Sequence, residues 1–239
     1  MQLENITNPS KFETKRTYDD ACGTAHGLEL IGERWALLVL RELMLGPRRF
    51  SDLRADLPGI SANTLTQRLT ELEERGLVVK RRLPPPASVQ VYEATEWGLE
   101  AEPIVQALGR WAARSPRHDP TLAISGVSIL LSMRTMMDSE RARGLNAHLN
   151  FRFGEDRYTG HLHDGTIDIV RGQHDAPDLT IAAEPQALAA VMYGKAPYDL
   201  IIWSGDRALL DRFVDLFHLP PKAPAAALRP DLASLKGKP

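Results

Sequence analysis

A helical segment closed at both ends by turn residues constrains the fold of this chain more than any other feature. Residues 60–75 lie between Pro58-Gly59, which is typical of a turn, and Gly76, which is typical of a helix C-cap. At about 100° per residue, three leucines fall on one side of this segment, at positions 65, 69 and 72. We therefore expect a short helix with one buried face and one exposed face.

The exposed face of this helix carries amide and hydroxyl side chains. Asn63, Thr64 and Gln67 lie on or beside it, and Ser61 is a good N-cap residue. Amide side chains can bond adenine bidentately, threonine can contact the methyl group of thymine, and the free N–H groups of a helix N-terminus suit a phosphate. The pattern predicts a helix that reads DNA, and a solvated face of an ordinary helical domain is the alternative.

The elements around this helix have the order of a winged helix-turn-helix. Residues 21–45 and 50–57 have helical apolar spacing, and Gly46-Pro47 separates them. After the reading helix, two β-prone runs at 77–83 and 89–92 surround a proline triplet, which predicts a hairpin. A last amphipathic helix is expected over residues 97–114.

Charge is concentrated in this part of the chain. The net charge of the whole chain is −2, which excludes a polycation that coats nucleic acid by bulk charge. Residues 48–82 nevertheless hold eight Lys or Arg against five acidic residues. Two basic clusters, Arg48-Arg49 and Lys80-Arg81-Arg82, would flank the reading helix and neutralise the DNA backbone.

Residues 18–114 resemble the HxlR family of bacterial winged-helix transcription regulators, which is close to the MarR group. The similarity rests on dense blocks, among them Gly46-Pro47-Arg48-Arg49-Phe50 and Pro58-Gly59-Ile60-Ser61. The resemblance implies a homodimer, held by the first and last helices of the domain, on a pseudo-palindromic double-stranded operator. It implies base contacts from Ser61, Asn63, Thr64 and Gln67, and contacts to phosphates or the minor groove from Arg48, Arg49, Arg68, Arg81 and Arg82.

Cys22 is the only cysteine, so an internal disulfide is excluded. Members of the family that sense oxidants or electrophiles use a cysteine just before the first main helix, and Cys22 is at the matching place. Gly23 follows it where the family commonly has proline, and Asp19 and Asp20 would, if near, favour the neutral thiol. A redox role of Cys22 is therefore an alternative, and a small residue without such a role is the preferred interpretation.

A break at residues 115–120 separates the helical first half of the chain from a second half with several strand-like runs. We expect a helix at about 121–138, strands at 145–153, 156–163, 166–171 and 179–183, a helix at about 185–193, a short run at 200–203 and a helix at 206–217. The predicted organisation is a mobile N-terminus (1–17), a winged helix-turn-helix domain (18–116), a second domain (117–221) and a flexible tail (222–239). The fold class is α+β.

Residues 121–219 resemble the sterol carrier protein type 2 family in short blocks such as Asp178-Leu179-Thr180-Ile181 and residues 204–213. The resemblance implies a five-stranded sheet with helices over an apolar pocket. Methionines adapt to irregular apolar ligands, and aromatic rings can supply walls. The candidate ligand-binding residues are Met133, Met136, Met137, Phe151, Phe153, Tyr193 and Trp203, and plain core residues are the alternative for all of them.

Signals of other function classes are missing from the sequence. There is no Gly-x-Ser-x-Gly elbow, phosphate-binding glycine loop or His-Glu-x-x-His motif, so we expect no enzyme and no cofactor. His161 and His163 project from one face of a predicted strand without an evident third ligand, so no metal site is expected. No signal peptide or membrane span is evident, which favours a cytoplasmic protein.

These observations predict a dimeric DNA-binding transcription regulator whose DNA affinity responds to a hydrophobic small molecule in the second domain. Three alternatives remain open: a regulator whose second domain only serves structure or dimerisation, a redox sensor acting through Cys22, and a lipid carrier with no DNA role.

Overall fold

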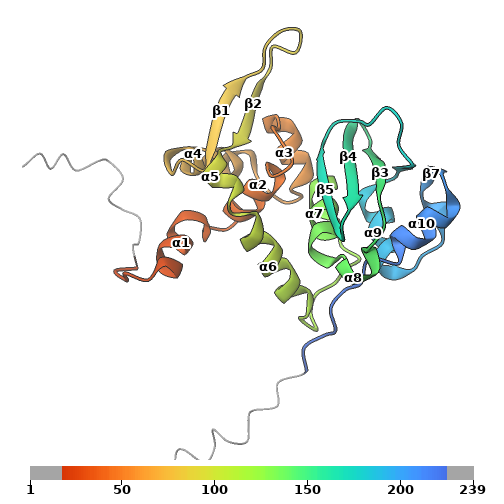
Figure 1. The fold of residues 1–239 in the computed structure, drawn as a ribbon. Coiled ribbons are helices and arrows are strands. Elements are labelled where there is room, and N and C mark those ends of the chain that lie inside the picture. Colours follow the sequence, from red (N-terminus) through yellow and green to blue (C-terminus); the bar gives the residue numbers. More distant parts are fainter. Residues whose placement is uncertain (1–17, 225–239) are drawn as a thin grey trace, which may run out of the picture.

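The computed structural model describes residues 18–224 and has the predicted mixed α+β class (Figure 1). A helical unit with a projecting hairpin lies beside a unit built on a five-stranded sheet. The predicted mobile segment 1–17 lies outside the described residues, as do residues 225–239 of the predicted tail. No helix within residues 18–224 is both long and apolar enough to cross a membrane.

The N-terminal unit contains four helices before its hairpin: α1 (Gly23–Ile31), α2 (Ala36–Glu42), α3 (Phe50–Asp56) and α4 (Ala62–Glu74). The single helix predicted over residues 21–45 is wrong, because the chain breaks into α1 and α2. Trp35 takes the left-handed conformation at the start of α2, with φ 79°, and its side chain packs against the core. Burial of this ring stabilises a turn that apolar spacing alone does not reveal.

α4 forms as its sequence predicts. The Ser61 side chain caps it by accepting a hydrogen bond from the Thr64 N–H at 3.1 Å, and Gly76 follows it with φ +73°. The leucines at positions 65, 69 and 72 are fully buried. This burial fixes which face of α4 remains exposed.

The hairpin joins β1 (Val78–Arg82) to β2 (Gln90–Ala94) in antiparallel register, with Lys80 opposite Tyr92. A bridge between Arg48 and Tyr92 attaches the turn before α3 to this hairpin. The helix predicted over residues 97–114 divides into α5 (Glu96–Leu99) and α6 (Glu102–Ala113).

The C-terminal unit contains β3 (Ala147–Phe153), β4 (Asp156–His163), β5 (Thr166–Arg171), β6 (Leu179–Ala182) and β7 (Ile202–Gly205). The strand order is β5-β4-β3-β6-β7, and only the β3–β6 pair is parallel. Burial alternates along β4 and β5, so one face of the sheet joins the core and the other faces outward. The core face shares its apolar cluster with α7 (Gly126–Met136), α9 (Pro185–Gly194) and α10 (Arg207–Val214).

Two short elements of this unit were not predicted, α8 (Ser139–Ala142) and the 3-10 helix η1 (Tyr198–Leu200). α7 begins at residue 126 rather than 121, because Ser125 caps it by accepting a hydrogen bond from the Ser128 N–H. The start of the predicted flexible tail is held against α6: the Ala223 N–H donates to the Arg114 carbonyl at 2.7 Å, and Lys222 Nζ donates to the Ala113 carbonyl.

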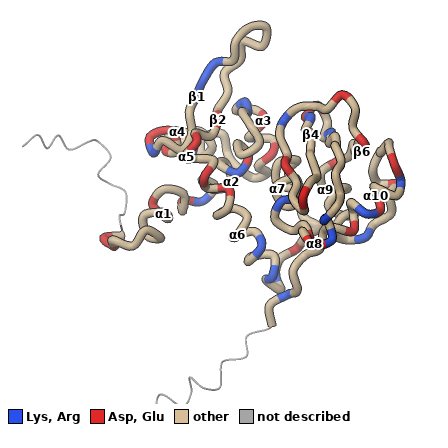
Figure 2. The backbone as a smooth tube through the Cα atoms, viewed as in Figure 1, with Lys and Arg blue, Asp and Glu red and all other residues tan. Residues whose placement is uncertain are grey.

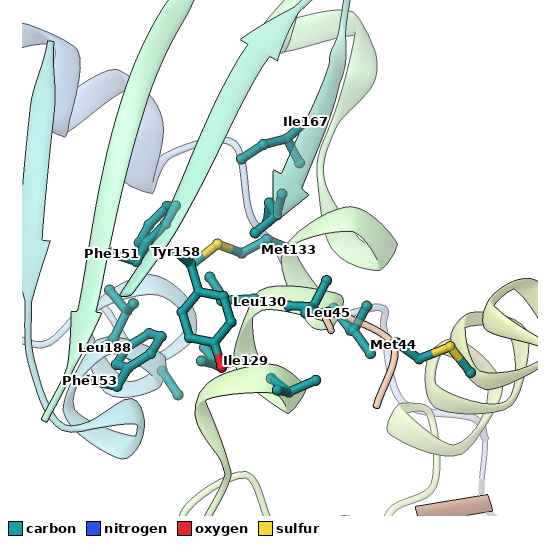
Figure 3. Close-up of a cluster of buried hydrophobic side chains, with 14 of the residues drawn as sticks. Met44, Leu45, Ile129, Leu130, Met133, Phe151, Phe153, Tyr158, Ile167 and Leu188 are labelled. Carbon is teal, nitrogen blue, oxygen red and sulfur yellow. The ribbon is translucent and has the colours of Figure 1, made fainter. Parts of the chain in front are cut away.

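One apolar core runs through both units. α7 packs against α2 and α6, and Met44 and Leu45 from the N-terminal unit lie near Ile129 and Leu130 of α7 (Figure 3). On the other side of α7, the cluster continues to the aromatic side chains of β3 and β4. Because the two units share this core, they are expected to lose their structure together.

Leu130→Ala tests this shared core. Leu130 has no exposed surface, so its truncation is expected to lower the free energy of unfolding by about 2–5 kcal/mol. Urea unfolding followed by circular dichroism measures the change. The matched control is Leu122→Ala, whose leucine is 67% exposed and which is expected to change stability by less than about 0.5 kcal/mol. A variant that unfolds in two steps, with the N-terminal unit unaffected, would contradict the shared core.

Candidate nucleic-acid interface

The exposed side of α4 carries the polar residues predicted to read bases. Asn63 and Gln67 are exposed, and Thr66 and Thr70 lie on the same side. Ser61 and Thr64 sit at the helix start, where their hydroxyl oxygens lie 2.8 Å apart. The Gln67 amide donates to Glu71 Oε1 at 3.1 Å, and the residue is exposed. This face therefore presents hydrogen-bonding groups at the spacing of a helix turn.

The hairpin carries a run of basic residues on β1 (Figure 2). Lys80 and Arg82 alternate with Arg81 along β1, and all three are exposed. Arg81 forms a salt bridge with Glu93 across the hairpin. Lys80 lies 5.7 Å from the ring centre of Tyr92, and Arg82 Nε donates to the Ser88 carbonyl at 3.1 Å. Lys80 and Arg82 thus keep charges that no carboxylate within residues 18–224 neutralises.

Arg48 does not belong to this basic surface, which corrects the sequence prediction. Its side chain is 5% exposed and pairs with Asp56 of α3 and, at 2.5 Å, with Asp156 of β4. Burial acts to raise the pKa of Asp156, but hydrogen bonds from Arg48 and Arg171 outweigh it and lower this pKa below its ordinary value. Arg48 therefore joins the two units and cannot reach a phosphate in this arrangement.

Arg68 is also a correction. It is 8% exposed, and its Nη1 donates to Glu71 Oε2 at 2.6 Å and lies 3.4 Å from Glu33 Oε2. It lies on α4 between the leucine face and the exposed face, and its guanidinium ties α4 to the turn between α1 and α2. The position of Arg68 around the axis of α4, rather than its residue type, decides its environment.

Two arginines on α3 and its start remain available. Arg49 is exposed, as predicted, and Arg54 is exposed on the last turn of α3. Neither forms a salt bridge within the described part of the chain. Arg54 lies outside the two predicted basic clusters, and its position on the polar side of the short helix 50–57 was the signal that could have identified it.

Cys22 is an exposed free thiol at the N-cap of α1. Hydrogen bonds from the Thr24 backbone and side chain and from the Ala25 backbone lower the pKa of this thiol. Asp20, expected to oppose ionisation, instead accepts a hydrogen bond from the Cys22 N–H at 2.9 Å. The site therefore favours the thiolate more than its sequence neighbours indicate.

The predicted ligand-binding residues of the C-terminal unit are not gathered in one place. Met133, Phe151 and Phe153 are buried in the core under the sheet, where Phe151 and Phe213 lie 6.1 Å apart. Met137 forms an isolated bridge with Phe217, and Trp203 of β7 lies 5.8 Å from the Arg207 guanidinium. Met136 and Tyr193 do line a cavity, which lies between the two units. Core packing explains the rest of this set.

His161 and His163 belong to a row of four stacked imidazoles on the outer face of the sheet. Their ring centres lie 4.6 Å apart, and His148 stacks on His161 at 4.3 Å and on His174 at 4.0 Å. His163 Nε2 donates to Asp168 Oδ2 at 2.9 Å, and this hydrogen bond to a carboxylate raises the pKa of the imidazole. Within residues 18–224, no group of three or more candidate ligands is placed to hold a metal ion.

Comparison with known proteins finds relatives of the N-terminal unit. The sequence model described as HxlR-like helix-turn-helix matches residues 30–119. The HTH-type transcriptional regulator YkvN of Bacillus subtilis (strain 168) is 40% identical over 94 residues, which are 38% of this chain and 77% of that protein. YvaP of the same organism is 37% identical over 86 residues, 36% of this chain and 79% of that protein.

Solved structures give partial matches. The reduced form of the transcriptional regulator YodB from B. subtilis is 31% identical, and the match covers 42% of this chain and 100% of that chain with a TM-score of 0.37. The redox regulator HypR in its oxidized form is 31% identical over 38% of this chain and 94% of that chain, with a TM-score of 0.36.

Arg48→Met separates a structural role from a DNA-binding role. Removing the guanidinium leaves Asp56 and Asp156 part-buried without their cation, so the free energy of unfolding is expected to fall by about 3 kcal/mol. Urea unfolding of the full chain measures this loss. Arg49→Met, at the exposed neighbour, is the control and is expected to leave stability within about 0.5 kcal/mol. Equal stability of the two variants would contradict the placement of Arg48.

Proposed function

This chain belongs to the HxlR-like helix-turn-helix family of transcriptional regulators, and we propose that it binds a specific double-stranded operator through α4 and the β1–β2 hairpin. The observation that carries the proposal is the exposed amide and hydroxyl face of α4, with basic side chains on either side of it. In this proposal α4 enters the major groove, and Ser61, Asn63, Thr64 and Gln67 lie nearest the bases.

The contacts to the DNA backbone are assigned to basic side chains that are exposed and have no carboxylate partner among the described residues. Arg49 and Arg54 of α3 and Lys80 and Arg82 of the hairpin are exposed and lack a carboxylate partner among the described residues, so they are assigned to phosphates or the minor groove. Arg81 contributes less, because Glu93 offsets its charge. Arg48 and Arg68 are left out, because both are buried in ion pairs.

A homodimer is part of the proposal. α6 exposes a row of large apolar side chains at helical spacing: Ile104 is 52%, Leu108 45% and Trp111 72% exposed. Leu28 of α1 is 48% exposed as well. Exposed apolar patches of this kind mark interaction sites, and a two-fold interface here would present two α4 helices to a pseudo-palindromic operator.

The C-terminal unit is assigned to controlling the position of the DNA-binding unit. Its α7 packs on α2 and α6, and the Arg48–Asp156 pair adds a polar link. The relationship of the C-terminal unit to the sterol carrier protein type 2 family stays a prediction, since the matched family model ends at residue 119. Control by a hydrophobic small molecule also stays in the proposal, but the packed core under the sheet moves the candidate site to the space between the units.

Gln67→Ala tests the base-reading assignment on an operator fragment identified by genomic footprinting. The loss of its amide is expected to cost roughly 1–3 kcal/mol of affinity for the operator and little for random DNA. Arg82→Ala is the matched phosphate variant. It should weaken binding to both sequences and reduce the slope of log affinity against log salt by about one. If both variants weaken operator and random DNA alike, the assignment of Gln67 is wrong.

Redox sensing through Cys22 is a second candidate function. The observation that favours it is the lowered pKa of this exposed thiol at the start of α1, since the thiolate is the form that oxidants attack. α1 also carries Leu28 of the proposed dimer surface. Oxidation of Cys22 to a sulfenic acid, an adduct or a disulfide between protomers would therefore alter the dimer.

Cys22→Ser tests this second function. Wild-type protein treated with hydrogen peroxide or a quinone is expected to change its operator affinity, measured by fluorescence anisotropy, and dithiothreitol is expected to reverse any disulfide. The serine variant should bind the operator as the untreated wild type does and show no response to oxidant. An identical response in both proteins would exclude Cys22 as the sensor.

A further inference from the structure

A cavity of about 330 Å³ lies between the two units. Its walls come from α2 and α6 on one side and from α7 and α9 on the other, with Leu38, Ala112, Leu131 and Tyr193 among the lining residues. This volume is at the lower end of the range for sites of small organic ligands, about 300–1,000 Å³. Most of the lining is apolar, so the cavity suits a compact ring system or a medium-length chain.

Arg41 gives the cavity wall a positive charge. Arg41 and His118 line it, and no Asp or Glu is among its described lining residues. The Arg41 guanidinium uses Nε and Nη2 to donate to Glu42 Oε1, at 2.9 and 2.6 Å. Its Nη1 takes no part in that pair and is available to a second acceptor.

A free hydroxyl lies at the same end of the cavity. Ser128 lines the cavity, and its hydroxyl has no hydrogen-bond partner within the described residues. Its backbone N–H donates to Ser125 Oγ, which in turn donates to Glu42 Oε1, the oxygen that Arg41 also contacts. Arg41 and Ser128 are thus gathered at the N-terminus of α7, where the helix dipole adds to the attraction for an anion.

Glu42 pairs with Arg41 through only one of its two carboxyl oxygens, Oε1. Its carboxyl is fully buried, and burial raises its pKa despite the nearby Arg41. Its Oε2 has no hydrogen-bond partner among the described residues. Glu42 thus engages Nε and Nη2 of Arg41 and leaves Nη1 outside the pair.

A second polar part of the cavity wall is neutral. Tyr193 OH and Ser132 Oγ lie 2.7 Å apart, and Ser132 donates its proton to the Ile129 carbonyl. The Tyr193 hydroxyl therefore donates to Ser132. Burial raises the pKa of Tyr193 to about 12, so this phenol brings no negative charge to the cavity at neutral pH.

We propose that this cavity, called the interdomain cavity below, binds a small amphipathic organic anion. The apolar body of the ligand lies against Leu131, Met136 and Ala112, and its carboxylate or sulfonate accepts hydrogen bonds from Arg41 Nη1 and the Ser128 hydroxyl. An aromatic acid or a medium-chain fatty acid has this chemistry.

A ligand in the interdomain cavity contacts both units, which links its binding to the position of α4. α2 forms one wall and also packs against α4. If the ligand prefers one arrangement of the units, it shifts the population of DNA-competent protein, and operator DNA shifts ligand affinity by the same factor. Only this regulatory consequence rests on the proposed function.

The test uses full-length protein without DNA and two fluorescent probes. 1-Anilinonaphthalene-8-sulfonate is an amphipathic anion, and N-phenyl-1-naphthylamine is its neutral analogue without the sulfonate. The wild type is expected to bind the anion saturably. Arg41→Gln should weaken the anion about tenfold, the loss expected for one charge-assisted hydrogen bond, and leave the neutral probe nearly unchanged.

A matched pair of variants at Gly109 locates the probe. Gly109 lines the cavity, and a Cβ there would meet no atom within 4 Å. Gly109→Phe is designed to fill the cavity, whereas Gly109→Ala leaves most of it open, and both replace glycine by a better helix former. Anion binding is expected to be lost in the Phe variant and kept in the Ala variant, with thermal unfolding showing that both are folded.

Two results would overturn the proposal: equal anion binding by the two Gly109 variants, or an Arg41→Gln effect that is the same for both probes. The proposed function has a separate readout, the operator affinity of ligand-free protein. Protein that binds the operator but fails the Gly109 test refutes only the cavity site. Anion affinity that is identical with and without operator DNA, where a change of about fivefold or more is expected, refutes the regulatory link.

Discussion

Burial of α7 against α2 and α6 is the interaction on which the rest of this structure depends. The apolar side chains of α7 belong to the core of the sheet unit and, at the same time, to the core of the helical unit. The position of α4 relative to the sheet is therefore set by packed side chains rather than by a linker. A densely packed interface moves between discrete arrangements and does not deform gradually, so the C-terminal unit holds α4 in a defined position.

The packing of the two units against each other also decides which basic side chains remain at the surface, as the buried Arg48 shows. A guanidinium that the sequence places in a basic cluster is used between the units, where Asp56 and Asp156 neutralise it. Removing Arg48 and Arg68 from the basic surface leaves Arg49, Arg54, Lys80 and Arg82 around α4. The proposed operator interface is thus smaller than the local charge count indicates, and its salt dependence should follow these four side chains.

Two candidate regulatory sites, Cys22 and the interdomain cavity, lie at different places on the N-terminal unit. Cys22 begins α1, whose Leu28 lies on the proposed dimer surface, and the interdomain cavity is bounded by α2 and α6. Leu108 of α6 both lines the cavity and belongs to the exposed row proposed for dimer contact. In the proposed dimer, a change at either site would act on the helices that set the spacing of the two α4 helices.

Most helices and strands, and the exposed amide and hydroxyl face of α4, follow from the sequence alone. Helix spacing and turn residues were sufficient for α3, α4, the hairpin and strands β3 to β6, and the leucines of α4 fixed that Asn63 and Gln67 face solvent. Tertiary contacts place Arg48 and Arg68 inside, make Met133 and Phe151 core residues and leave a cavity between the units. Charge and apolarity are properties of single residues, whereas burial and pairing depend on how separate segments pack together, as for Arg48 and Asp156, which are 108 positions apart.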